Sequence, residues 1–324
     1  MQTDFNGLNI GTLDGQTAVG TGMTGIWDSN SGVPDVFAGD LVAPAGTNFG
    51  LVQSVGNGPQ KVRFDNAERQ NGVDFATPLS GTVWGTFLVN TNNGGTAGIG
   101  INSVISFASL NGRPKILASG TDLMFFPADV ENEDVVVTNV LPGAGDSLIL
   151  FKMFHDGVTG FTIDIWANPD LTAALPTPLI SSASASFSNI WPFNRIGVGG
   201  SRFATGLDSY IDFVSLSDGP NAYEEVTGVP LVESLDGDLN GDGFVGITDL
   251  NIVLGVWNQN VTPGDLLAGD PSGDGFVGID DLNTVLGNWN AGVPPTASEA
   301  VPEPTTLTCL AIGSLLMMRH SRKD

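Results

Sequence analysis

The sequence predicts a mainly β protein, made of two packed antiparallel sheets, a small α-helical module and a C-terminal hydrophobic helix. Three observations predict this. Short apolar runs alternate with Gly, Asn, Pro and Asp turns over the first two thirds of the chain. The 44 Gly and 19 Pro of its 324 residues disfavour long helices. A 21-residue segment then occurs twice near the end.

The strands expected in residues 1–218 are short and bounded by turns. Phe161, Ile163 and Ile165 alternate with the residues between them, which is the period of a half-buried strand. No stretch in this region keeps a 3.6-residue period, so two packed sheets are the simplest arrangement. The candidate strands are 61–65, 82–90, 97–106, 114–118, 135–141, 147–154, 160–166, 194–199 and 209–216.

Three late segments resemble strands of concanavalin-A-like, laminin-G-like jelly rolls: FTIDIWANPD (161–170), RIGVGG (195–200) and SYIDFVSLSDG (209–219). The opening LDGQTAVGTGMTGIW (13–27) is similar to the start of bacterial members of that group. The resemblance implies a jelly-roll sandwich over residues 1–218, a fold that often serves carbohydrate binding or adhesion.

The charge of the chain is strongly acidic and unevenly distributed. With 35 acidic and 11 basic side chains, the formal net charge is −24, which argues against nucleic acid and anionic membranes as partners. Such a surface fits divalent cations or neutral sugars. Between Arg202 and Arg319 there are 17 acidic residues and no Lys or Arg, which indicates separate modules. We expect linkers at 219–235 and 293–300, flanking a module at 236–292.

The repeated segments, 238–258 and 270–290, are identical at 16 of 21 positions and follow a calcium-loop pattern. This spacing wraps oxygen ligands around one cation, so we predict two bound calcium ions. The Phe residues contribute backbone carbonyls. The predicted ligands are Asp238, Asn240, Asp242, Phe244 and Asp249 in the first loop, and Asp270, Ser272, Asp274, Phe276 and Asp281 in the second.

Details of the loops support this interpretation. Gly243 is expected at a sharp turn with positive φ, and Gly246 and Gly278 leave room for a water ligand. Asn240 is a better ligand than Ser272, so the first loop is predicted to bind more tightly. The alternative is a pair of solvated acidic turns without metal.

A helix is expected after each loop, because apolar residues recur at i, i+3, i+4 and i+7. These are Leu250, Val253, Leu254 and Trp257, then Leu282, Val285, Leu286 and Trp289. We predict that the two Trp pack in the core rather than stack on sugars. Thr248 and Asp280 are the expected N-caps. Val245 and Val277 are expected to pair the two loops through a short β-bridge.

This duplicated unit resembles a type I dockerin, which implies folding on two calcium ions and docking onto a cohesin-type domain. In that family the residues at loop positions 10 and 11 dominate the contact, here Ile247, Thr248, Ile279 and Asp280. Thr248 suits the family pattern, whereas Asp280 departs from it. A calcium-stabilised stalk module is the alternative interpretation.

The last 24 residues combine a VPEP motif, an apolar run over 307–318 and a basic end. They resemble the PEP-CTERM sorting signal, which implies recognition at Pro302, Glu303 and Pro304 by an exosortase-type peptidase in the cell envelope. About 14 helical residues span about 21 Å, short of a bilayer core of about 30 Å. A buried amphipathic helix is the alternative. Met1 to Gly11 show no secretory signal, and we expect the true start upstream.

The sequence does not predict an enzyme. Jelly-roll glucanases place two carboxylates on one strand. Here Asp164 stands alone in its strand, and Glu68, Glu131 and Glu133 show no such pattern. His155 is expected in an exposed turn. We therefore expect a non-catalytic exported cell-envelope protein, carbohydrate-binding or adhesive. The alternative is a dockerin-borne component of polysaccharide degradation.

Overall fold

The computed structural model describes residues 2–3, 5–6, 8–31, 34–51, 60–64, 69–92, 94–101, 114–127, 134–155, 160–186, 193–202, 208–232 and 235–294. The chain divides into two compact units, Met1–Glu233 and Ser234–Asp324. Each unit is described by itself.

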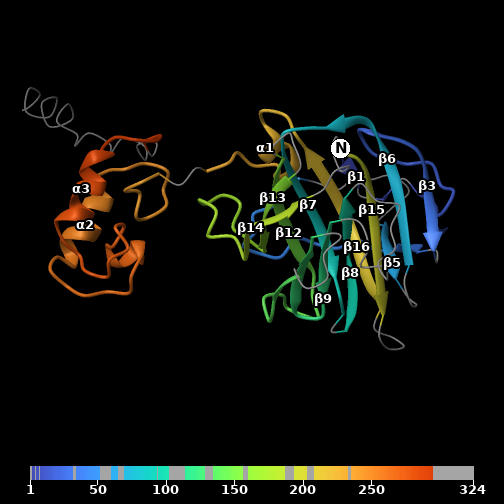
Figure 1. The fold of residues 1–324 in the computed structure, drawn as a ribbon, viewed down its shortest axis with the longest axis horizontal. Coiled ribbons are helices and arrows are strands. Elements are labelled where there is room, and N and C mark those ends of the chain that lie inside the picture. Colours follow the sequence, from blue (N-terminus) through green and yellow to red (C-terminus); the bar gives the residue numbers. More distant parts are fainter. Residues whose placement is uncertain are drawn as a thin grey trace, which may run out of the picture. The chain divides into compact units, whose positions relative to one another are not determined.

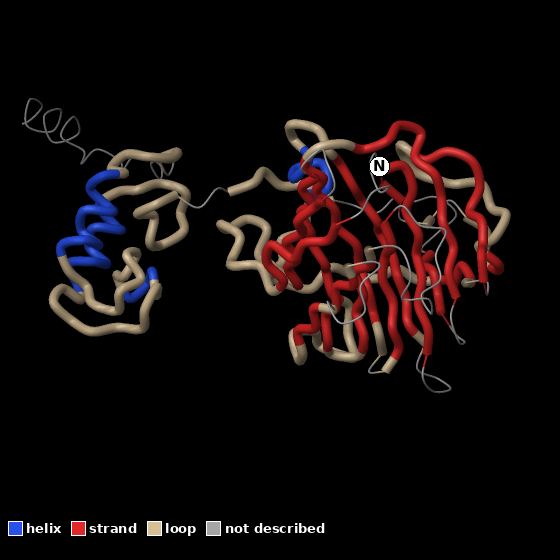
Figure 2. The backbone as a smooth tube through the Cα atoms, in the orientation of Figure 1, coloured by secondary structure: helices blue, strands red, loops and turns tan. Residues whose placement is uncertain are grey.

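The first unit is built almost entirely of strands, arranged as two antiparallel sheets (Figures 1 and 2). The larger sheet has the order β14-β13-β12-β7-β16-β5-β4-β2, with β1 also paired to β16. Its strands are β1 (Gln2–Thr3), β2 (Gly11–Thr12), β4 (Asp35–Ala38), β5 (Gln60–Phe64), β7 (Thr82–Asn90), β12 (Ser147–His155), β13 (Gly160–Ala167), β14 (Ile180–Ser186) and β16 (Ser209–Ser217).

The smaller sheet has the order β11-β10-β9-β8-β15-β6-β3. Its strands are β3 (Met23–Ser31), β6 (Arg69–Leu79), β8 (Gly95–Ile101), β9 (Lys115–Ser119), β10 (Asp122–Phe126), β11 (Val135–Val137) and β15 (Phe193–Arg202). The chain crosses repeatedly between the sheets, for example at β6–β7, β7–β8 and β15–β16, whereas the runs β8 to β11 and β12 to β14 each stay within one sheet.

The main core contains buried side chains from both sheets. Phe87 and Phe151 of the larger sheet and Val198 of the smaller one are fully buried in one cluster. The ring of Phe151 lies so close to β7 that a Cβ on Gly85 would come within 2.2 Å of it. Burial of this apolar surface drives the two sheets together. The predicted mainly β sandwich is confirmed.

All nine candidate strands coincide at least in part with strands of the sandwich. Of the candidate 135–141, only Val135–Val137 form a strand. Residues 102–106 of the candidate 97–106 lie outside the described residues. The structure adds strands that the sequence did not predict: β1 to β4, β6, β10 and β14.

The outer face of the larger sheet is covered by the short helix α1 (Ala222–Thr227), which packs against β7 and β16. Tyr223 and Val226 of this helix are buried with Trp84 and Trp166 of the sheet. The expected polar linker at 219–235 is therefore wrong over the helix. Its apolar residues recur at the spacing of one helical turn and give it a face to bury.

The C-terminal end of α1 contacts the loop that precedes β5. The N–H of Gly50 donates a 2.8 Å hydrogen bond to the carbonyl of Thr227. Gly228 ends the helix at φ +76°, and a Cβ there would come within 2.5 Å of the Gly50 backbone. Both the positive φ and the close approach to Gly50 require glycine at position 228.

The described part of the second unit, residues 235–294, contains three short helices, of which α2 and α3 are labelled in Figure 1. They are α2 (Ile247–Gly255), the 3₁₀ helix η1 (Leu266–Ala268) and α3 (Ile279–Gly287). Gly246 and Gly278 are the N-caps of α2 and α3, so the expectation of Thr248 and Asp280 is wrong. Each cap N–H donates to the carboxylate three residues later, Asp249 or Asp281. The acidic residue that closes each loop thus also fixes the start of its helix.

Each loop pairs with the backbone that follows the helix of the other repeat. Val245 exchanges backbone hydrogen bonds with Asn290 and Ala291, beyond α3, while Val277 exchanges them with Asn258 and Gln259, beyond α2. The expected direct bridge between Val245 and Val277 is wrong. Both valines are fully buried in the small core of the unit. Each half of the repeat therefore supplies the pairing edge for the other half.

Within the described residues, no helix is long and apolar enough to cross a membrane. The predicted tail helix and its motif residues Pro302, Glu303 and Pro304 lie outside the described residues.

Candidate metal centre

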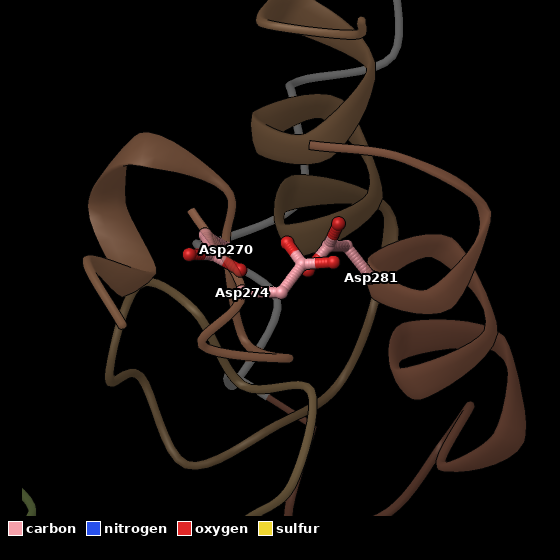
Figure 3. Close-up of side chains that lie close together, drawn as sticks. All are labelled: Asp270, Asp274 and Asp281. Atoms are coloured by element: carbon pink, nitrogen blue, oxygen red, sulfur yellow. The ribbon is translucent and has the colours of Figure 1, made fainter. Parts of the chain in front are cut away.

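Three carboxylates of the second loop lie together at the start of α3 (Figure 3). Asp270, Asp274 and Asp281 each offer an oxygen, and these oxygens lie within 4.8 Å of one another. Asp270 and Asp281 are buried, whereas Asp274 is exposed. Like charges held this close repel one another, and a hard divalent cation removes the repulsion. Among the described residues, this is the one acidic group with such geometry.

Asp270 is held in its charged form by the loop backbone. Burial of its carboxyl is the largest single influence and opposes ionisation. Hydrogen bonds from the N–H groups of Gly264, Gly275 and Gly273, and from the Ser272 hydroxyl, outweigh it and lower the pKa to about 2. The group is therefore an anion at neutral pH, as a cation ligand must be.

Ser272 uses its side chain to hold Asp270. Its Oγ donates to Asp270 Oδ1 at 3.0 Å, and its N–H donates to Asp281 Oδ1 at 3.1 Å. The residue at loop position 3 thus connects two of the three acidic ligands. Asp274 in turn accepts the N–H of Phe276 at 2.8 Å through Oδ1.

The first loop has the same backbone plan. Asp238 Oδ1 and Oδ2 accept N–H groups at loop positions 4 to 6, and Asp249 Oδ1 accepts those of Leu239 and Asn240. Gly243 has φ +80°, as expected for loop position 6. The side-chain amide of Asn240 donates to Asp242 at 3.0 Å. Asp238, Asp242 and Asp249 do not form a group as close as that in the second loop.

The glycines at loop position 9 have a role that the sequence did not reveal. A Cβ on Gly246 would come within 2.8 Å of the Phe244 ring, and one on Gly278 within 3.1 Å of the Phe276 ring. The aromatic residue at position 7 therefore lies over the glycine at position 9. A larger residue would push the ring away and disturb the carbonyl ligand at position 7.

Apolar side chains surround these loops at the surface. Trp257 and Trp289 are 41% and 40% exposed, so the expectation that they pack in the core is wrong. Helices α2 and α3 end at Gly255 and Gly287, and both Trp lie beyond the buried part of the stripe. Two further repeat-related pairs of apolar side chains are exposed: Ile247 with Ile279, and Leu254 with Leu286.

Of the residues considered for catalysis, Asp164 is the one whose side chain the structure describes. Asp164 lies on β13 opposite Lys152 of β12. Glu68, Glu131 and Glu133 lie outside the described residues, and the side chain of His155 is not described.

No protein-family model matches the chain, and no curated protein matches it. Several solved structures are weakly similar. The carbohydrate recognition domain of Emp46p, in its metal-free form, has a TM-score of 0.33 and 9% identity, over 49% of this chain and 82% of that one. The legume lectin-like domain from Entamoeba histolytica has a TM-score of 0.32 and 11% identity, over 57% and 90%. The carbohydrate-binding module CBM66 from Bacillus subtilis has a TM-score of 0.32 and 12% identity, over 60% and 96%. Likeness at this level carries no argument about the ligand of this chain.

Proposed function

We propose that this protein is a non-catalytic, two-unit binding protein whose second unit is organised by two calcium ions. The observation that carries the proposal is the convergence of Asp270, Asp274 and Asp281 within a loop that the chain repeats. Oxygen ligands at this spacing suit calcium, and loops of this plan supply further backbone and water ligands.

Calcium would supply much of the folding free energy of the second unit. Among its described residues, five apolar side chains form the buried core: Leu239, Val245, Val253, Val277 and Val285. So small a core is marginal by itself. Cation binding that neutralises the loop carboxylates adds directly to the stability of the folded unit.

The second unit would then dock to a partner protein, of which a cohesin-type domain is the candidate. Support comes from the exposed pairs Ile247 with Ile279 and Trp257 with Trp289. Large apolar and aromatic side chains at a surface are typical of protein contacts. Residues 235–294 contain nine Asp and no Lys or Arg, so a basic rim on the partner would complement them.

The sandwich is proposed to bind a glycan, in keeping with its jelly-roll resemblance and the acidic character of the chain.

The tail resemblance supports export of the protein to the cell envelope, where an exosortase-type peptidase would recognise Pro302, Glu303 and Pro304. Replacing these three residues is expected to leave an unprocessed, membrane-retained precursor. Unchanged mass and location would contradict this part of the proposal.

The central test is a calorimetric titration of the full chain with calcium, paired with circular dichroism before and after chelation. We expect two bound ions and loss of helix signal in excess chelator, with the sheet signal retained. Magnesium serves as the control cation, because it demands a smaller octahedral shell. No calcium binding, or a helix signal that survives chelation, would overturn the proposal. A panel of polysaccharides incubated with the same protein should show no hydrolysis.

A further inference from the structure

The first unit has a pocket of about 620 Å³ at one end of the larger sheet. It lies between the β6–β7 turn at Ser80–Thr82, the chain entering α1, and the segment Pro230–Leu231. Its size falls within the usual range for small-molecule sites, about 300–1,000 Å³. All its lining residues belong to the first unit.

Flat and apolar groups line one part of this pocket. Trp84 belongs to the lining but is only 8% exposed. Its ring is stacked on Trp166 at a centroid distance of 5.8 Å, is met edge-on by Tyr223 at 5.1 Å, and has Lys152 Nζ 5.3 Å from its centroid. These contacts fix the ring in place before any ligand arrives. Pro220 and Pro230 add rigid apolar walls.

Polar groups with unused hydrogen-bonding capacity line the remainder. The side chains of Thr82, Asn221 and Glu224 have no hydrogen bond or ion pair within the described residues. Asn221 is the N-cap residue of α1, yet its side chain does not cap the helix. Asp218 uses Oδ2 to accept the N–H of Ser80 at 2.6 Å, which leaves Oδ1 available.

The charge of the lining selects among ligands. Asp218 and Glu224 are acidic, and no Lys or Arg lines the pocket. Phosphates, sulfates and uronic acids would meet unfavourable charge there. A simple cation would need acceptors only, whereas Thr82 and Asn221 both donate and accept. Sugar hydroxyls also do both, and carboxylates accept strong hydrogen bonds from them.

We propose that this pocket binds a neutral saccharide, with its apolar face against the walls formed by Pro220 and Pro230 and its hydroxyls donated to Asp218 and Glu224. The inference rests on the proposed glycan function and assigns it a location and a charge class. Each hydrogen bond to a carboxylate contributes enough that its loss weakens binding about tenfold or more.

The test measures glycan binding by the full chain in calcium. The probes are neutral oligosaccharides of glucan, xylan, mannan and galactan, their uronic-acid counterparts and a lysine-containing peptide. We expect a neutral oligosaccharide to bind and Glu224→Gln to weaken it about tenfold. Asn221→Trp, at an exposed position with no side-chain bonds to lose, should fill the pocket and abolish binding. Glu225→Gln is the matched control, since it removes the same charge from the same helix outside the lining.

The outcomes separate the pocket from the broader function. A neutral glycan that binds all variants equally would overturn the pocket and leave glycan binding standing. Binding of the peptide or the uronic acids in place of neutral sugars would overturn the ligand class. Absence of any bound glycan would overturn both this inference and the glycan function.

Discussion

The carboxylate of Asp212 accepts a 3.0 Å hydrogen bond from the backbone N–H of Leu41, although the two residues are 171 positions apart. Asp212 is fully buried at a bulge of β16, where its other oxygen accepts the N–H of Phe213. Phe213 has φ +45°, a conformation rare for an aromatic residue. The buried charge thus holds both the bulge and the loop over the outer face of the sheet.

Replacing Asp212 with Ala is expected to destabilise the sandwich by about 1–3 kcal/mol, because it leaves buried N–H groups without an acceptor. Asp212→Asn keeps one acceptor oxygen and should cost less. Urea unfolding followed through the sheet signal measures both variants. Equal and negligible losses would show that the carboxylate does not hold the loop.

The contact between Gly50 and Gly228 gives a second stability prediction. Gly228→Ala should cost about 2–4 kcal/mol, because the residue has positive φ and its Cβ would overlap the Gly50 backbone. Gly120→Ala is the matched control, since Gly120 also has positive φ but nothing lies within 4 Å of its Cβ position. The same unfolding assay should show a clearly smaller loss for the control.

Tyr223 predicts a loss of stability at high pH. Burial, followed by the nearby charge of Asp170, raises its pKa from 10.0 to about 12. A phenol that ionises more easily in the unfolded chain favours unfolding once the pH passes the unfolded pKa. Its contribution is therefore intact below pH 10 and lost as the pH rises toward 12. Because the chain has two tyrosines, the ultraviolet titration compares the native chain with Tyr223→Phe, which should remove a late tyrosinate transition. If the substitution instead removes a transition near pH 10, the burial of Tyr223 is contradicted.

The two calcium loops are expected to differ, in the order opposite to that predicted from the residue at loop position 3. Three carboxylates already converge in the second loop, and Ser272 helps to hold them. Less reorganisation on binding means higher affinity. Asp281→Ala should therefore lower calcium affinity more than Asp249→Ala in calorimetric titrations. The reverse order would indicate that the ligand type at position 3 decides.

The sequence predicted the sandwich well where apolar alternation is regular, as in Phe161, Ile163 and Ile165 of β13. It missed β3, because this strand carries Thr, Gly, Asp, Ser and Asn and its register to β6 shifts twice. It also missed α1, whose six residues are too few to show a helical period. Helices that short form through tertiary packing, here against Trp84 and Trp166, rather than through local propensity.

For the candidate metal centre, spacing alone predicted that Asp270, Asp274 and Asp281 belong to one loop, since loop geometry is local in sequence. It could not rank the loops, because the ranking rests on how closely the carboxylates converge in space. It could not locate the Trp side chains either, because their exposure depends on where α2 and α3 end. The helices end two residues before Trp257 and Trp289. The pocket beside Trp84 was invisible to the sequence, because its lining comes from three separate segments.

The crosswise pairing of the calcium repeats limits how the second unit can be divided. A chain cut after Gln259 keeps the first loop but loses the segment at Asn290 and Ala291 to which Val245 is hydrogen-bonded. The surviving segment at Asn258 and Gln259 normally pairs with Val277, whose sequence surroundings nearly repeat those of Val245. A second copy of the same half offers that missing complement. An isolated half should therefore assemble as a symmetric dimer that exchanges these edges, and its folding should depend on protein concentration.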